Sequence, residues 1–137
     1  MATLVDTNVL IDIAVRDPVW LKWSRSQVEH AIGRGSVIIN QIIFSEFSMR
    51  YETIDEVESL LPEDEFRREG LPWEAAFAAS KAFGLYRRQG GPRERVLPDF
   101  FIGAHAAIRG YSILTRDPNG YRTYFPNLEI IAPDTHP

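Results

Sequence analysis

The stretch "MATLVDTNVLID", residues 1–12, indicates the fold of the whole chain through the order of its residue types. Residues 2–5 form a short apolar run that suits a buried strand, and an acid, Asp6, follows at once. Residues 7–15 then place apolar side chains at positions 9, 10, 13 and 14, which is the spacing of one helix face. In open α/β sheets, ligands bind beyond the carboxyl ends of the strands. Asp6 is therefore either the cap of the following helix or one side of a binding site.

Short strands and amphipathic helices alternate along the rest of the chain. Apolar, β-branched runs predict further strands at 36–40, 111–115 and 128–133. Helical spacing with capping residues or proline and glycine at the ends predicts helices at 18–33, 41–51, 53–62, 72–89 and 98–110. This alternation predicts a three-layer α/β/α fold with a central parallel sheet. No repeat, linker or low-complexity tract divides the chain, so we expect a single domain over residues 1–137.

The composition narrows the class of protein. With 45% hydrophobic and 25% charged residues, the 137-residue chain is ordinary for a globular protein. No apolar run approaches the roughly 18 residues that cross a membrane, and no secretory leader is visible. The absence of cysteine excludes disulfides, thiolate nucleophiles and thiolate zinc sites. We therefore expect a cytoplasmic protein without membrane contact.

The net charge of −4 argues against a broad basic face for nucleic acid. It is compatible with a nuclease, because carboxylates that hold a metal themselves make the total negative. Basic residues still gather before Asp99, at Arg87, Arg88, Arg93 and Arg95. A solvated loop and a local nucleic-acid contact are equally good interpretations of this run.

Four acids follow strands or begin helices at positions that the expected fold brings to one rim of the sheet: Asp6, Glu46, Asp99 and Asp117. Each has a simpler interpretation as a helix cap, a favourable first-turn charge or part of a solvated face. Glu46 and Asp99, however, interrupt the strongly apolar stretches "IIFSEFS" and "VLPDFFIGAHA". Because an unpaired buried charge is very costly, such acids are usually paired or bind a metal.

A hard divalent cation would relieve the repulsion among these acids. Mg²⁺ and Mn²⁺ prefer oxygen ligands, and Mg²⁺ takes one or two carboxylates directly while it keeps waters. The three histidines show no spacing typical of zinc ligands. A bound Mg²⁺ or Mn²⁺ suits phosphodiester hydrolysis, because the ion activates a water and offsets charge on the phosphate. A remaining acid would orient or deprotonate that water.

The ordered set "LVDTNVLID … FSEF … LPDFFIGAHA … ILTRDPNGYRTYFP" resembles the PIN-domain ribonucleases, in particular the VapC toxins of bacterial toxin–antitoxin pairs. The resemblance covers nearly the whole chain. It implies a PIN fold, endoribonuclease activity that depends on Mg²⁺ or Mn²⁺, and a homodimer. It also implies a small antitoxin that blocks the site and joins in repressing the shared operon, so that operator DNA is met only through that complex.

The same resemblance assigns roles to individual residues. The catalytic acidic quartet of the family falls on Asp6, Glu46, Asp99 and Asp117. Among these, the resemblance ties Asp6, Asp99 and Asp117 to the metal. Asn8 and Thr115 match polar positions that support the acids or touch phosphate. The quartet shows no departure from the family pattern.

Two rival classes are weighed against this interpretation. Phosphatases of the haloacid dehalogenase type also carry an Asp after their first strand, but they need a second Asp where this chain has Asn8. A non-catalytic binding module, PIN-like or receiver-like, is the other rival. A receiver requires a late lysine, whereas the last lysine here, Lys81, lies in the middle of a predicted helix. Replacement of Asp99 by Asn separates the classes, because a nuclease loses cleavage and a scaffold keeps its partner.

Several conspicuous residues stay outside the predicted site. Asp12 is expected to be solvated or to support the site from behind, and His105 to be a hydrogen-bonded structural residue rather than a general base. Arg116, beside Asp117, could contact RNA phosphate, and the sequence favours neither this contact nor its absence. Helix packing or a dimer contact is favoured over base stacking for the three tryptophans, Trp20, Trp23 and Trp73.

Overall fold

A five-stranded parallel sheet forms the centre of the protein. The computed structural model describes residues 1–90 and 97–137, in which the strands are ordered β3-β2-β1-β4-β5. All neighbouring strands in this order run parallel. The strands are β1 (Thr3–Val5), β2 (Val37–Ile39), β3 (Arg67–Arg68), β4 (Ser112–Leu114) and β5 (Ile130–Ile131).

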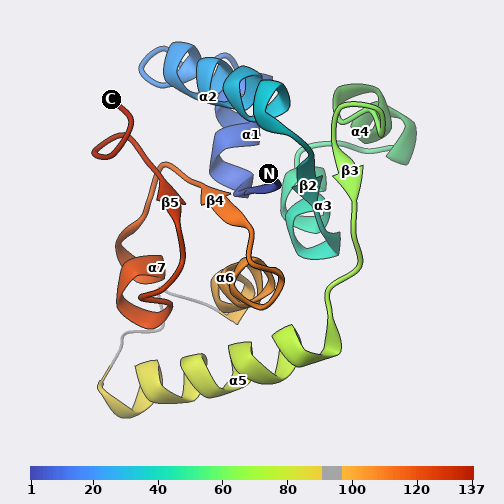
Figure 1. Ribbon diagram of the computed structural model, residues 1–137. Helices are drawn as coiled ribbons and strands as arrows, with labels where there is room; N and C mark the ends of the chain where they lie inside the picture. Colours follow the sequence, from blue (N-terminus) through green and yellow to red (C-terminus); the bar gives the residue numbers. More distant parts are fainter. Residues whose placement is uncertain (91–96) are drawn as a thin grey trace.

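Helices cover both faces of this sheet (Figure 1). The helices are α1 (Thr7–Ala14), α2 (Leu21–Arg34), α3 (Gln41–Ser48), α4 (Ile54–Leu60), α5 (Trp73–Arg88), α6 (Leu97–Arg109) and α7 (Asn119–Tyr124). α1 and α2 lie on one side, and α6, with α5 packed along it, lies on the other. The predicted three-layer α/β/α fold is therefore confirmed. Within the described ranges, no helix has the length and apolar character needed to span a bilayer.

The three central strands are buried on both faces. Leu4 and Val5 of β1, Ile38 of β2, and Ile113 and Leu114 of β4 are completely inaccessible to solvent. Strands covered on both faces consist of continuous apolar residues rather than alternating apolar and polar ones. This pattern makes these segments recognisable in the sequence. The chain leaves each of them at the same edge of the sheet, where Asp6 follows β1, Glu46 lies in the helix after β2, and Asp117 follows β4.

Two elements were not predicted from the sequence. β3 consists of two exposed arginines and is a strand only because it pairs with β2, Ile38 with Arg67 and Ile39 with Arg68. α7 follows "DPN", a sequence typical of a turn, and its one buried residue is Tyr121. Neither segment carries a hydrophobic period, so the tertiary contacts decide its conformation.

Some predicted bounds differ from the observed ones. The helix expected from Pro18 begins at Leu21, because the Asp17 carboxylate accepts hydrogen bonds from the amides of Val19 and Trp20 and so caps a separate turn. The helix expected over 41–51 ends at Ser48. Arg93 and Arg95 of the basic run before Asp99 lie outside the described residues.

Candidate active site

All four predicted acids line one cavity at the carboxyl edge of the sheet. Asp6 connects β1 to α1, Glu46 lies in α3, Asp99 in the first turn of α6, and Asp117 follows β4. The cavity has a volume of about 230 Å³. Its other lining residues are Thr7, Asn8, Ile11, Met49, Arg50 and Tyr121. The structure thus brings together side chains from four segments far apart in the sequence.

Asp6 is held by hydrogen bonds to both of its carboxylate oxygens. It is the N-cap of α1, where its Oδ1 accepts a hydrogen bond from the Thr7 amide at 2.8 Å. Its Oδ2 accepts hydrogen bonds from the hydroxyls of Thr115 at 2.8 Å and Tyr121 at 2.9 Å. A longer contact of 3.4 Å joins this oxygen to Asn8 Nδ2. The two interpretations of Asp6 are therefore compatible, since it caps a helix and lines the cavity.

Burial works against negative charge in this cavity. It raises the pKa of Asp6 to about 6, although the hydrogen bonds from Thr115 and Tyr121 oppose the rise and the charge of Asp99 adds to it. Burial and the charge of Asp99 also raise the pKa of Glu46. A cation bound among these acids would favour their ionised forms. Burial and mutual repulsion therefore both disfavour the ionised forms of Asp6 and Glu46.

Two supporting residues were predicted, and both contact Asp6. Thr115 Oγ1 accepts a hydrogen bond from the Asp117 amide at 3.0 Å while it donates to Asp6. Asn8 donates to Asp6 through Nδ2, and its Oδ1 accepts a hydrogen bond from the Arg116 amide at 3.1 Å. These contacts fasten the segment after β4, and with it Asp117, to the start of α1.

Two further residues of the cavity were missed in the sequence. Thr7 donates a hydrogen bond from Oγ1 to Glu46 Oε1 at 2.8 Å and so ties α1 to α3. Tyr121 reaches Asp6 from α7. Burial and the charge of Asp6 hold the pKa of Tyr121 well above its usual range, so its hydroxyl remains a donor. The position of Thr7 directly after Asp6 could have indicated its role in the sequence. No sequence pattern around Tyr121 pointed to the cavity.

Asp12 and Arg116 form an ion pair behind the cavity. Asp12 is 1% exposed, so the prediction of a solvated Asp12 is wrong, and the supporting position is the one observed. Its carboxylate accepts hydrogen bonds from Arg116 Nε at 2.8 Å and Nη2 at 3.0 Å, and from Ser24 Oγ at 2.8 Å. The Arg116 guanidinium also lies over the ring of Trp20, 5.5 Å from its centroid. Arg116 therefore serves the architecture of the loop that carries Asp117.

His105 lies in a separate buried cluster and does not line the acidic cavity. Asn40 Oδ1 accepts the Ile43 amide hydrogen bond, so Nδ2 of Asn40 donates to Nδ1 of His105 at 2.9 Å. This leaves Nε2 of His105 as the donor to Glu69 Oε1 at 3.4 Å. Burial lowers the pKa of His105, which favours the neutral ring. These contacts agree with the predicted structural role.

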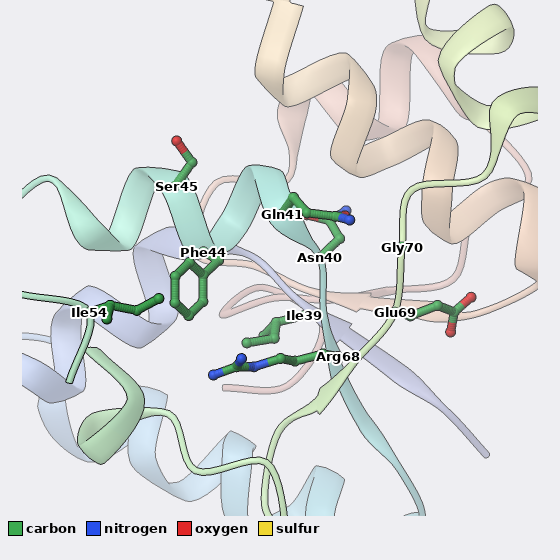
Figure 2. A pocket seen from close by; sticks show the side chains of 9 residues that line it. All are labelled: Ile39, Asn40, Gln41, Phe44, Ser45, Ile54, Arg68, Glu69 and Gly70. Atoms are coloured by element: carbon green, nitrogen blue, oxygen red, sulfur yellow. The ribbon is translucent and has the colours of Figure 1, made fainter. Parts of the chain in front are cut away.

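A second cavity of about 300 Å³ lies between α3 and β3 and shares no lining residue with the acidic cavity. Figure 2 shows Phe44, Ile54 and Arg68 around it, with the Glu69 carboxylate directed away. The Arg68 guanidinium lies 5.0 Å from the centroid of the Phe44 ring. None of the four acids lines this second cavity.

The donor set of the acidic cavity suits a hard cation. It consists of carboxylate, amide and hydroxyl oxygens, which Mg²⁺ and Mn²⁺ prefer. Across the described residues, no three acidic or histidine side chains already converge on a single point as a finished ligand set. Mg²⁺ keeps several waters and takes one or two carboxylates directly, so it does not need such a cluster.

The sequence model of the PIN-domain family matches residues 3–126, and the chain therefore belongs to this family. Among solved structures, VapBC2 from Rickettsia felis bound to a promoter DNA fragment is similar, with a TM-score of 0.75, 14% identity, and coverage of 96% of this chain and 98% of that chain. VapBC-1 from nontypeable Haemophilus influenzae gives a TM-score of 0.74 at 15% identity, with the same coverage of 96% and 98%.

FitAcB from Neisseria gonorrhoeae gives a TM-score of 0.67 at 18% identity and covers 94% of this chain and 96% of that chain. At these identities the likeness establishes the shared fold. A search among curated proteins found no significant sequence match. The family resemblance seen in the sequence is confirmed by the family match and agrees with the fold.

Proposed function

We propose that this chain is a divalent-metal-dependent endoribonuclease and the toxin of a VapC-type toxin–antitoxin pair. Membership of the PIN-domain family supports the nuclease class. The fold shared with VapBC complexes supports the toxin assignment. The observation that carries the proposal is the single cavity lined by Asp6, Glu46, Asp99 and Asp117.

In this proposal Asp6, Asp99 and Asp117 hold a Mg²⁺ or Mn²⁺ ion. When bound, the ion lowers the pKa of a water and offsets charge on the scissile phosphate. Glu46 orients the water and accepts its proton, a role that suits a carboxylate whose pKa is raised by burial. The water oxygen bonds to phosphorus as the P–O bond to the leaving ribose breaks. Arg50 is the cation among the cavity-lining residues and is placed to meet phosphate charge.

The proposed partners follow from the same assignment. RNA is the substrate, and a cognate antitoxin blocks the cavity. We expect a homodimer of single-domain subunits, each spanning residues 1–137, that acts in the cytoplasm. The promoter fragment in the Rickettsia felis VapBC2 structure supports contact with operator DNA through the antitoxin complex.

A non-catalytic PIN-like binding module is the second candidate. The observation that favours it is that no three carboxylates among the described residues are already gathered around one point. A receiver-like module is disfavoured by the family match, and a haloacid dehalogenase-type phosphatase by Asn8 at the position of its second Asp.

The test compares melting temperature against Mn²⁺ for wild type and Asp99→Asn, without antitoxin. A ligand that binds only the folded state stabilises it by about 2.7 kcal/mol at a hundredfold excess over Kd. We expect the melting temperature to rise with Mn²⁺ in wild type and in the control Asp64→Asn, which changes an exposed acid outside the cavity lining. We expect no rise in Asp99→Asn. Cleavage of a mixture of structured RNAs should be lost in Asp99→Asn and on chelation. A folded wild type that neither responds to Mn²⁺ nor cleaves RNA would favour the scaffold.

A further inference from the structure

Tyr121 is the residue of α7 that reaches the acidic cavity. Its side chain is 4% exposed, and its hydroxyl donates a hydrogen bond to Asp6 Oδ2 at 2.9 Å. The bond joins residues 115 positions apart in the sequence. A buried tyrosine normally finds a partner for its hydroxyl. Here the partner is the carboxylate that lies deepest among the four acids of the cavity.

The two oxygens of Asp6 are hydrogen-bonded unequally. Oδ2 accepts short bonds from Thr115 and Tyr121 and a longer one from Asn8. Within the described part of the chain, Oδ1 accepts one bond, from the Thr7 amide. A carboxylate oxygen has about two acceptor positions. Oδ2 is therefore saturated, and Oδ1 keeps one position for a further partner.

We propose that Tyr121 is a positioning residue of the proposed metal site, and that its hydrogen bond to Oδ2 makes Asp6 present a single oxygen, Oδ1, to the ion. This inference rests on the proposed function, because it assumes that Asp6 binds the metal. Tyr121 itself contacts neither metal nor substrate in this assignment. Its effect passes through the orientation of the Asp6 carboxylate.

The position of the Tyr121 ring is set by close packing between α6 and α7. A Cβ added to Gly103 would lie 3.0 Å from Tyr121 Cδ1 and 2.5 Å from Phe125 Cε2. Gly103 lies one helical turn after Asp99 on α6. The helix that carries Asp99 therefore also holds the ring whose hydroxyl orients Asp6, and the two acids are positioned together.

A carboxylate that offers only one oxygen to a metal ion should bind some ions better than others. Mg²⁺ demands near-ideal octahedral geometry, whereas Ca²⁺ accepts carboxylates through one or both oxygens in flexible geometry. Mn²⁺ suits the same kind of oxygen site as Mg²⁺. A hydrogen bond that occupies Oδ2 should therefore favour Mn²⁺ and Mg²⁺ over Ca²⁺.

The experiment measures Mn²⁺ and Ca²⁺ affinity by isothermal titration of antitoxin-free protein with the chloride salts, for wild type, Tyr121→Phe and Tyr124→Phe. Tyr124→Phe is the matched control, because its hydroxyl lies on the same helix but donates to Gln89. Loss of a hydrogen bond that orients a metal ligand typically costs 10–100-fold in affinity. We expect Tyr121→Phe to weaken Mn²⁺ binding about tenfold and Ca²⁺ binding less than about threefold, and Tyr124→Phe to leave both unchanged.

A second variant, Gly103→Ala, displaces the Tyr121 ring but keeps its hydroxyl. Like Tyr121→Phe, it should lower the preference for Mn²⁺ over Ca²⁺. If Tyr121→Phe lowers both affinities equally, or neither, Tyr121 is a packing residue and the inference is wrong, while the proposed metal site stands. If wild type binds no Mn²⁺, both the proposed metal site and the inference fail. The melting temperature without metal, measured for every variant, separates loss of folding from loss of the hydrogen bond.

Discussion

At the scale of single residues, Asp6 is costly to the fold in the absence of a cation. Its pKa of about 6 in the folded protein lies above the ordinary value of 3.8, so the fold prefers the protonated form. The resulting stability is fully present below pH 3.8 and is lost as the pH rises through about 6. At pH 7.5 ionisation of this carboxylate lowers the free energy of unfolding by about 3 kcal/mol.

Asp6→Asn should therefore raise the melting temperature of metal-free protein at pH 7.5 and change it little at pH 4. Calorimetry in the presence of a chelator at the two pH values measures this difference. At pH 7.5 the variant should also lose the response to Mn²⁺. A gain of equal size at both pH values would contradict the burial argument.

Thr7 offers a second test at this scale, because it holds Glu46 through a single side-chain hydrogen bond. Thr7→Val removes that bond and should reduce RNA cleavage roughly 10–100-fold, the cost expected for a residue that orients a catalytic group. The expected loss of stability is about 1 kcal/mol.

Thr3→Val is the matched control for Thr7→Val. The Thr3 hydroxyl is buried in β1 and has no hydrogen-bond partner among the described residues. Its removal should leave cleavage unchanged and stability equal or slightly higher. Equal loss of cleavage in the two variants would mean that the effect comes from the fold and not from Glu46.

At the scale of elements, Gly103 of α6 lies in close contact with the rings of Tyr121 and Phe125. Gly103→Ala places a methyl group against the rings of Phe125 and Tyr121, and overpacking of this kind typically costs 1–3 kcal/mol. Gly33→Ala is the control, since no atom lies within 4 Å of a Cβ added there in α2. It should stabilise the protein by up to about 1 kcal/mol. Chemical denaturation measures both changes, and equal changes would refute the packing argument.

The predicted elements differ in how far their own residues determine them. Thr53 is the N-cap of α4, and its hydroxyl accepts a hydrogen bond from the Glu56 amide, as the capping pattern predicted. β1 and β2 are apolar enough to be recognised without their partners. β3 is not, because two exposed arginines become a strand only beside β2. The shorter an element is, the more its conformation depends on its neighbours.

At the scale of the whole molecule, α5 carries an exposed apolar stripe that suits the proposed homodimer. Trp73 is 88% exposed and Phe77, one turn later, is 66% exposed, whereas the opposite face of α5 packs on α6. Packing of Trp73 against a helix of the same chain is therefore wrong, and of the two remaining alternatives the dimer contact stays the favoured prediction over base stacking.

Trp73→Glu combined with Phe77→Glu should convert a dimer into monomers. Burying each aromatic side chain contributes about 1.5–3 kcal/mol, so the double change should weaken association at least roughly a hundredfold. Light scattering during size-exclusion chromatography measures the mass. Val19→Glu, which alters an equally exposed apolar residue before α2, should leave the mass unchanged. A dimer that survives the double change would place the interface elsewhere.

The sequence by itself predicted the order of the strands and helices, except β3 and α7, and the gathering of the four acids at one edge. Periodicity, caps and apolar runs act between near neighbours. The parallel topology then brings together the residues after β1, β2 and β4 and the first turn of α6, the helix that leads into β4. Only the tertiary structure decided which groups hold those acids. Thr7 meets Glu46 across 39 positions, Tyr121 meets Asp6 across 115, and the half-buried Arg116 pairs with Asp12. These contacts depend on how helices from distant segments pack, which no local pattern records.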